Sequence, residues 1–97
     1  MDRFDIKYII LYSLFQNRNK KNRYTIDEII DFAGTQYQIV YDKKPPSYIT
    51  FRRYLLQLNK EGYIEKQGRA YMINKEKYDE LKKYVRNHIK FEFINKI

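Results

Sequence analysis

Two adjacent arginines, followed by a glutamine one helical turn further along, carry side chains that can form paired hydrogen bonds with a flat polar partner. A guanidinium fork can bond both acceptors on the major-groove edge of guanine, and a carboxamide can bond adenine in the same way. Arg53 is therefore our first choice for a base contact, and Gln57 is the second. Ser47, Thr50 and Arg52 are better suited to hold phosphates at a helix N-terminus. The alternative is that the two arginines are ordinary exposed helix residues.

Two further cations flank a short turn. Lys66 and Arg69 enclose Gln67-Gly68, which we interpret as the two-residue turn of a β-hairpin. At such a tip both side chains can reach a phosphate backbone or a minor groove. An equally good alternative is that they only keep the hairpin soluble.

The charge of the chain is unevenly distributed. The 97 residues have a formal net charge of +8, and residues 35–60 carry five Lys/Arg against one acid. An excess of positive charge on one segment is what a polyanion-binding surface needs. A lysine-rich surface selected for solubility would explain the total charge but not its concentration.

Other kinds of chemistry lack the residues they require. The chain has no cysteine, and His88 is its one histidine, so we expect no metal site, no cofactor and no disulfide. There is no glycine-rich phosphate loop and no nucleophile elbow, and Asp27-Glu28 is explained by helix capping, so we expect no catalysis and no small-molecule substrate. The longest apolar run, residues 8–15, is too short to span a bilayer, and no signal-peptide pattern is present. We therefore expect a cytoplasmic protein that does not associate with membranes.

The elements that precede the basic segment are predicted from apolar spacing and capping. A stripe of apolar residues predicts a core helix over residues 3–16. Thr25 and Glu28 have the spacing of a capping box, which predicts a helix from Ile26 to about Ala33 that stops at Gly34. Residues 23–25 can add a short strand edge before it.

The basic segment itself is predicted to be a helix over residues 48–60. Residues 36–41 fit either a short strand or another helical turn, and we expect an elaborated loop over residues 35–46 that ends at Pro45-Pro46 and presents Ser47 as the helix cap. The core face of the helix consists of Phe51, Leu55 and Leu58. On the opposite face Ile49 and Leu56 point outward, which suits contacts with thymine methyls or packing beneath the loop.

The C-terminal third is predicted to be a hairpin followed by a helix. A turn at residues 67–68 pairs Lys66 with Arg69 and Ile64 with Tyr71, with Ile73 on the same inward face. Asn74 can cap a last helix that runs from Lys75 to about Ile94. The apolar stripe of that helix comprises Leu81, Val85, Ile89 and Phe93, with His88 beside it.

Residues 50–58 followed by residues 60–64 form a basic helix that ends in leucines, then a glycine and an apolar strand. This order resembles winged-helix DNA-binding proteins over roughly residues 4–73, and the extra C-terminal helix is similar to PadR-like regulators and to small winged-helix proteins of archaeal viruses and plasmids. The resemblance implies an α+β winged helix-turn-helix fold, with a three-helix core, a β-hairpin wing and an additional C-terminal helix. It also implies homodimers that bind operators, and in some cases proteins that spread along DNA for partition. The long connection at residues 35–46 departs from the simplest pattern of the family.

The last helix can pack in two ways. It can fold back on the first helix of its own chain, or it can pair across a two-fold axis. We expect the dimer, with residues 1–74 as the DNA-binding domain and residues 75–97 as the dimerisation element, because two recognition helices would then address half-sites ~34 Å apart. The expected function is sequence-specific binding of double-stranded DNA by a transcription regulator. The alternatives are a DNA-coating or partition adaptor, and a winged-helix module that binds protein.

Overall fold

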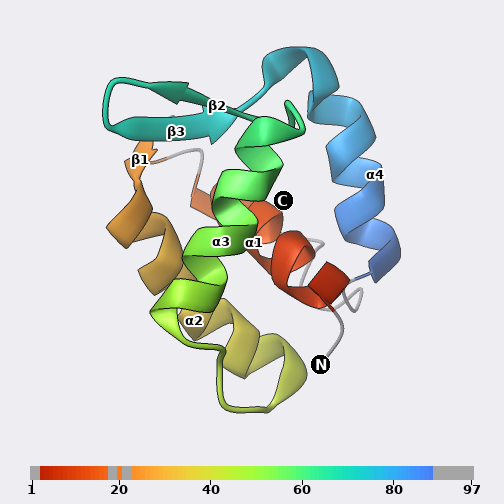
Figure 1. The fold of residues 1–97 in the computed structure, drawn as a ribbon. Coiled ribbons are helices and arrows are strands. Elements are labelled where there is room, and N and C mark those ends of the chain that lie inside the picture. Colours follow the sequence, from red (N-terminus) through yellow and green to blue (C-terminus); the bar gives the residue numbers. More distant parts are fainter. Residues whose placement is uncertain (1–2, 18–19, 21–22, 89–97) are drawn as a thin grey trace.

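The chain folds into helices packed around a small sheet (Figure 1). A computed structural model describes the backbone of residues 3–17, 20 and 23–88, and the side chains of residues 6–17, 20 and 23–87. The elements are α1 (Arg3–Asn17), β1 (Tyr24–Thr25), α2 (Ile26–Tyr41), α3 (Tyr48–Lys60), β2 (Ile64–Gln67), β3 (Ala70–Ile73), the 3-10 helix η1 (Lys75–Lys77) and α4 (Tyr78–His88). The described part of the chain is thus α+β, with four α-helices and a three-stranded antiparallel sheet in the order β1-β3-β2.

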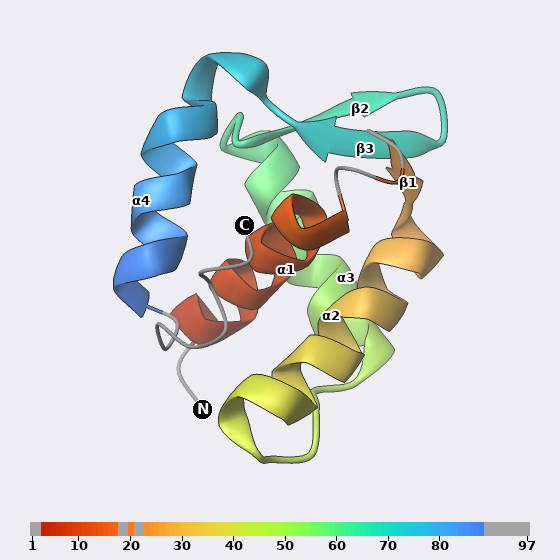
Figure 2. The same cartoon turned by 180° about the vertical axis from the view of Figure 1, so that it is seen from behind.

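Helix α1 forms the centre of the molecule and packs against α2, α3 and α4. Seen from the front, α3 lies before α1, with the β2–β3 hairpin extending to one side of its C-terminal end and α4 on the other side (Figure 1). From behind, α1 lies in front and α3 is at the back (Figure 2). The largest fully buried side chains come from the four α-helices and from β2: Ile9, Ile10, Tyr12, Phe15, Ile29, Tyr37, Phe51, Leu55, Leu58, Ile64, Leu81 and Val85.

The start of α2 is fixed by the capping box that the sequence predicts. The Thr25 hydroxyl accepts a hydrogen bond from the Glu28 amide at 3.3 Å, and the Glu28 carboxylate accepts one from the Thr25 amide at 3.0 Å. Thr25 is also the last residue of β1 and pairs with Ala70 of β3. One residue therefore ends a strand and begins a helix, which confirms the short strand edge expected before α2.

The prediction that α2 stops at Gly34 is wrong. The helix continues through Gly34 to Tyr41 and ends at Asp42, whose φ of 51° is left-handed and whose amide donates to the Gln38 carbonyl at 3.0 Å. A glycine inside a helix costs about 1 kcal/mol relative to alanine. The extra turns bury Tyr37 and Val40, and burial of two side chains of this size outweighs that cost. Residues 36–41, which fitted either a strand or a helical turn, are helical, so the loop expected over residues 35–46 is confined to residues 42–47.

Removal of the Thr25 hydroxyl should lower stability measurably. We expect Thr25→Ala to reduce the free energy of unfolding by about 1 kcal/mol, because the first turn of α2 loses its cap. Thr35→Ala is a matched control, since the exposed Thr35 hydroxyl donates only to the Asp31 carbonyl within the same helix. That control should be neutral or slightly stabilising. Urea unfolding followed by circular dichroism measures both, and equal effects would contradict a specific role for the cap.

Helix α3 has the predicted bounds and cap. The Ser47 hydroxyl accepts a hydrogen bond from the Thr50 amide at 3.3 Å, and Ser47 has extended backbone angles. Phe51, Leu55 and Leu58 are buried as expected. Leu56 differs from the prediction, because it is half-buried and packs against the core rather than pointing into solvent.

The hairpin forms, but its predicted register is wrong. The observed pairs are Ile64 with Ile73, Lys66 with Tyr71 and Gln67 with Ala70, so the turn residues are Gly68 and Arg69. Gly68 has a φ of +64°, and this position is the first of the two turn residues, where glycine relieves the strain of a positive φ. The predicted turn would have placed Gln67 there instead. Each partner shifts by two residues, so the inward face is the same as predicted.

The last helix packs within its own chain. Asn74 caps η1 by accepting from the Glu76 amide at 3.0 Å, so the first turn is a 3-10 helix and α4 begins only at Tyr78. Leu81 and Val85 are 1% and 0% exposed in the single chain. We expected these two side chains at a dimer interface, and the structure instead places them in the core with α4 against α1. The other expected interface residues, Ile89, Phe93 and the side chain of His88, lie outside the described residues, as does the predicted extension of the helix to Ile94.

Candidate nucleic-acid interface

The outer face of α3 presents cations and amides to solvent. Arg52, Arg53, Gln57 and Lys60 are all exposed, whereas the buried residues of α3 lie on its opposite face. The helix contains no acidic residue. Figure 1 shows this helix at the front of the molecule, where its outer side is not crossed by another described element. The sequence therefore places the three cations on a surface that a polyanion can approach.

Arg53 has a defined neighbour on this face. Its guanidinium carbon lies 5.2 Å from the centre of the Tyr54 ring, within the range of a cation–π interaction. Such a contact orients the planar fork without occupying its donors. Arg53, Gln57 and Lys60 also line a shallow open hollow of about 640 Å³ together with Leu56 and Glu61. The two residues expected to contact bases thus lie beside one another.

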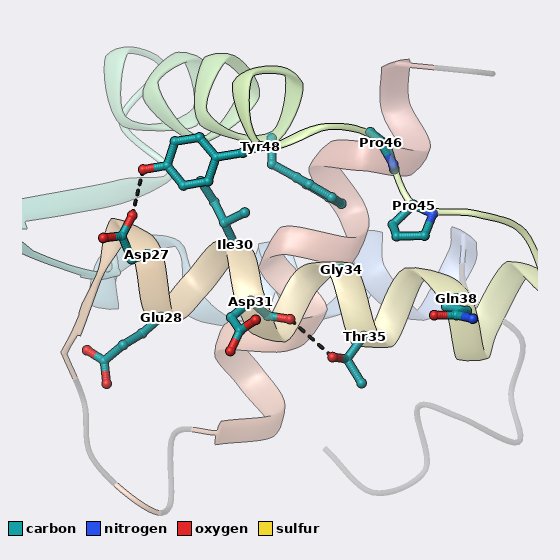
Figure 3. A pocket seen from close by; sticks show the side chains of 11 residues that line it. Asp27, Glu28, Ile30, Asp31, Gly34, Thr35, Gln38, Pro45, Pro46 and Tyr48 are labelled. Carbon is teal, nitrogen blue, oxygen red and sulfur yellow. Dashed lines mark hydrogen bonds between the residues drawn. The ribbon is translucent and has the colours of Figure 1, made fainter.

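The N-terminal end of α3 adjoins a groove with acidic walls (Figure 3). The groove has a volume of about 670 Å³ and lies between α2 and the loop that leads into α3. The Tyr48 hydroxyl donates to the Asp27 carboxylate at 2.6 Å, and this bond raises the pKa of the Tyr48 phenol above its ordinary value. Glu28 and Asp31 line the same groove. Three carboxylates here oppose the attraction of the helix N-terminus for an anion.

This arrangement bears on the residues expected to hold phosphates at the start of α3. Ser47 is exposed and Thr50 is half-buried, and their hydroxyl oxygens lie 3.1 Å apart. The Ser47 hydroxyl therefore both caps the helix and is bonded to the Thr50 hydroxyl. Of the three residues expected to contact phosphates, Arg52 is the exposed one whose side chain takes no part in the cap.

The hairpin carries the second group of cations. Lys66 and Arg69 are exposed, and Arg69 is the second residue of the turn. The Lys66 ammonium lies 6.0 Å from the centre of the Tyr71 ring. Arg23, which precedes β1, donates to the Gln67 side chain at 3.2 Å and so adds a third exposed cation beside the hairpin.

Arg23 and Lys60 are two cations of the candidate interface that were not predicted from the sequence. Lys60 lies seven residues after Arg53, two helical turns along the same face, so the helical period itself was the signal. Arg23 could have been found only by pairing the short strand edge with the hairpin. That pairing depends on the strand order β1-β3-β2, which no local pattern contains.

Among the residues that the structure describes, no group of three or more His, Asp and Glu side chains is placed to hold a metal ion. In the same part of the chain, every helix is too short or too polar to cross a membrane. Comparison with family models, with curated proteins and with solved structures gives no match for this chain.

Proposed function

We propose that this chain is a winged-helix protein that binds double-stranded DNA sequence-specifically and without catalysis, as a transcription regulator. In this proposal α3 enters the major groove and the β2–β3 hairpin contacts the flanking backbone. The observation that carries it is the exposed surface of α3, where three cations and one amide occur on a helix that contains no acid. The one carboxylate beside them, that of the C-cap Glu61, is paired with Lys7. An α-helix is narrow enough to enter the major groove of B-DNA with such a face against the base edges.

The order and pairing of the elements support the same proposal. A helix, a short strand, two helices and a hairpin follow one another, and the first strand pairs with the second strand of the hairpin. This pairing holds the hairpin beside α3, on the side away from α4 (Figure 1). A basic helix with a basic hairpin at its side can contact a groove and the adjacent phosphates together.

The acidic groove limits where phosphates are expected. Asp27, Glu28 and Asp31 make the first turn of α3 a poor place for an anion. Phosphate contacts are therefore expected from Arg52, Lys60 and the hairpin rather than from the capping hydroxyls. Arg53 and Gln57 remain the residues proposed to contact bases.

The salt dependence of binding tests this proposal. Five exposed cations other than Arg53, namely Arg23, Arg52, Lys60, Lys66 and Arg69, can neutralise about five phosphates, which predicts a slope of log K against log salt of roughly −4 to −5. Fluorescence anisotropy of a labelled duplex of random sequence, measured over a series of NaCl concentrations, gives the slope. Absence of binding at the lowest salt would overturn the proposal. A much shallower slope would mean that the hairpin and the helix do not bind the same duplex.

If the regulator is a homodimer, its two α3 helices would address half-sites ~34 Å apart.

Two other functions remain as candidates. A DNA-coating or partition adaptor would use the same residues but spread from a nucleation site, which would give ladders of complexes on long duplexes. A module that binds protein is favoured by one observation, the exposure of two isoleucines on different surfaces, Ile39 on α2 (52% exposed) and Ile49 on α3 (77% exposed). The anisotropy series separates the protein-binding module, which should not bind the duplex, from the regulator and the DNA-coating adaptor, which should.

A further inference from the structure

One apolar side chain on the outer face of α3 has no role in the fold. Ile49 is 77% exposed, the most exposed large hydrophobic residue among those that the structure describes. Leu56, the other residue expected to point outward, packs against the core instead. A β-branched residue is also a poorer helix former than alanine at an exposed position. Neither packing nor helix propensity therefore explains an isoleucine here.

The neighbours of Ile49 indicate what it contacts. Arg53 lies four residues further along α3, so the two side chains are adjacent on one face of the helix. Arg52 projects from the same exposed side. An apolar protein surface that bound Ile49 would also have to bury these guanidinium groups, which costs desolvation free energy. A polyanion that also presents an apolar group satisfies both kinds of side chain.

Duplex DNA has one such group in its major groove, the C5-methyl group of thymine. The N-terminal residues of a helix that enters the major groove are the ones that reach base edges, and Ile49 is the second residue of α3. We propose that Ile49 determines specificity by packing against a thymine methyl, next to a guanine contacted by Arg53. This inference rests on the proposed function and adds the base class that the helix selects.

The spacing of the two residues restricts the site. Four residues of an α-helix span roughly 6 Å, and successive base pairs are roughly 3.4 Å apart. The thymine and the guanine are therefore expected about one or two base pairs apart.

Removal of single methyl groups from the DNA tests the inference. Duplexes are first selected from a random pool with the wild-type protein. In the best duplex each thymine is then replaced, one at a time, by deoxyuridine, which lacks only the C5-methyl group. At one position, one or two base pairs from a guanine, the wild-type protein should lose about fourfold in affinity, as expected for one methyl group returned to water. Ile49→Ala should bind the thymine and deoxyuridine duplexes equally.

The control is the other exposed isoleucine. Ile39 lies on α2 and is 52% exposed, so Ile39→Ala removes the same atoms from a different surface and should keep the full methyl dependence. Equal binding of all deoxyuridine duplexes by the wild-type protein would overturn the inference and leave the proposed function intact. So would an Ile49→Ala variant that keeps the dependence at the same position. If the protein binds duplexes but enriches no sequence, base reading by Ile49 is wrong although binding stands, and if it binds no duplex at low salt, the proposed function fails as well.

Discussion

Simultaneous replacement of Arg52 and Arg53 by alanine is expected to weaken binding to a selected duplex by about 100-fold. Arg53 would lose a bidentate contact with a guanine edge, and Arg52 would lose a phosphate contact. The slope of log K against log salt should become shallower by about one unit, because Arg52 no longer neutralises a phosphate. Anisotropy titrations over a salt series measure both quantities. Neither substitution should affect folding, since the side chains of Arg52 and Arg53 are both exposed.

A charge-matched pair on α4 serves as the control. Lys83 and Arg86 are exposed and lie on the helix farthest from the hairpin tip in Figure 1. Their double replacement by alanine removes the same charge and should reduce affinity only slightly, through the long-range field. If the two double variants lose affinity equally, binding depends on overall charge and α3 has no special role.

A single arginine variant separates charge from geometry. Arg53→Lys keeps the positive charge but removes the planar fork that can bond both acceptors of guanine. It should therefore keep the salt slope while relaxing the preference for guanine at one position of the site. A preference that survives this change would assign base recognition to a residue other than Arg53.

Truncation of Leu81 is expected to have the largest effect on stability. Leu81→Ala should reduce the free energy of unfolding by about 2–5 kcal/mol, because the side chain is 1% exposed and its removal leaves a cavity between α4 and α1. For a domain of this size the whole stability is about 5–15 kcal/mol. The variant is thus expected to unfold well below the temperature at which the wild-type protein does.

The same experiment distinguishes packing within the chain from packing across a dimer. If α4 folds on its own α1, the urea midpoints of the wild-type protein and of Leu81→Ala should both be independent of protein concentration. Lys83→Ala on the exposed side of α4 is the control and should change stability by less than about 0.5 kcal/mol. A midpoint that rises with concentration in the wild-type protein and not in Leu81→Ala would instead place Leu81 between two subunits.

The parts of the fold that were predicted correctly depend on neighbouring residues. Ser47 and the Thr25–Glu28 pair have their partners within three residues, so the helix starts follow from local spacing alone. The buried face of α3 likewise follows from the helical period, since Phe51, Leu55 and Leu58 recur at helical spacing.

Two of the three parts that were predicted wrongly, the end of α2 and the packing of α4, depend on distant contacts. Gly34 stops a helix only if nothing is gained beyond it, and the gain from burying Tyr37 and Val40 requires the rest of the core. The packing of Leu81 against α1 depends in the same way on which surface is left open by the other helices. The third, the hairpin register, depends on neighbouring residues only. Its prediction turned on whether Gly68 is the first or the second residue of the turn.

The candidate interface was predicted from the sequence to a similar extent. The exposed positions of Arg52, Arg53 and Gln57 follow from their place on the helix opposite the leucines. The carboxylates beside the start of α3 were not foreseen as neighbours, because the loop of residues 42–47 brings α3 back along α2 (Figure 3). The position of Arg23 beside the hairpin depends on strand order in the same way.

The double role of Thr25 has a consequence for the dynamics of the molecule. Its backbone lies opposite Ala70 in the sheet, while its hydroxyl and amide hold the first turn of α2. Separation of the hairpin from β1 would therefore loosen the cap, and fraying of α2 would loosen the sheet. Local opening of the two elements is thus one cooperative event, so the hairpin cannot swing freely while the helices stay closed.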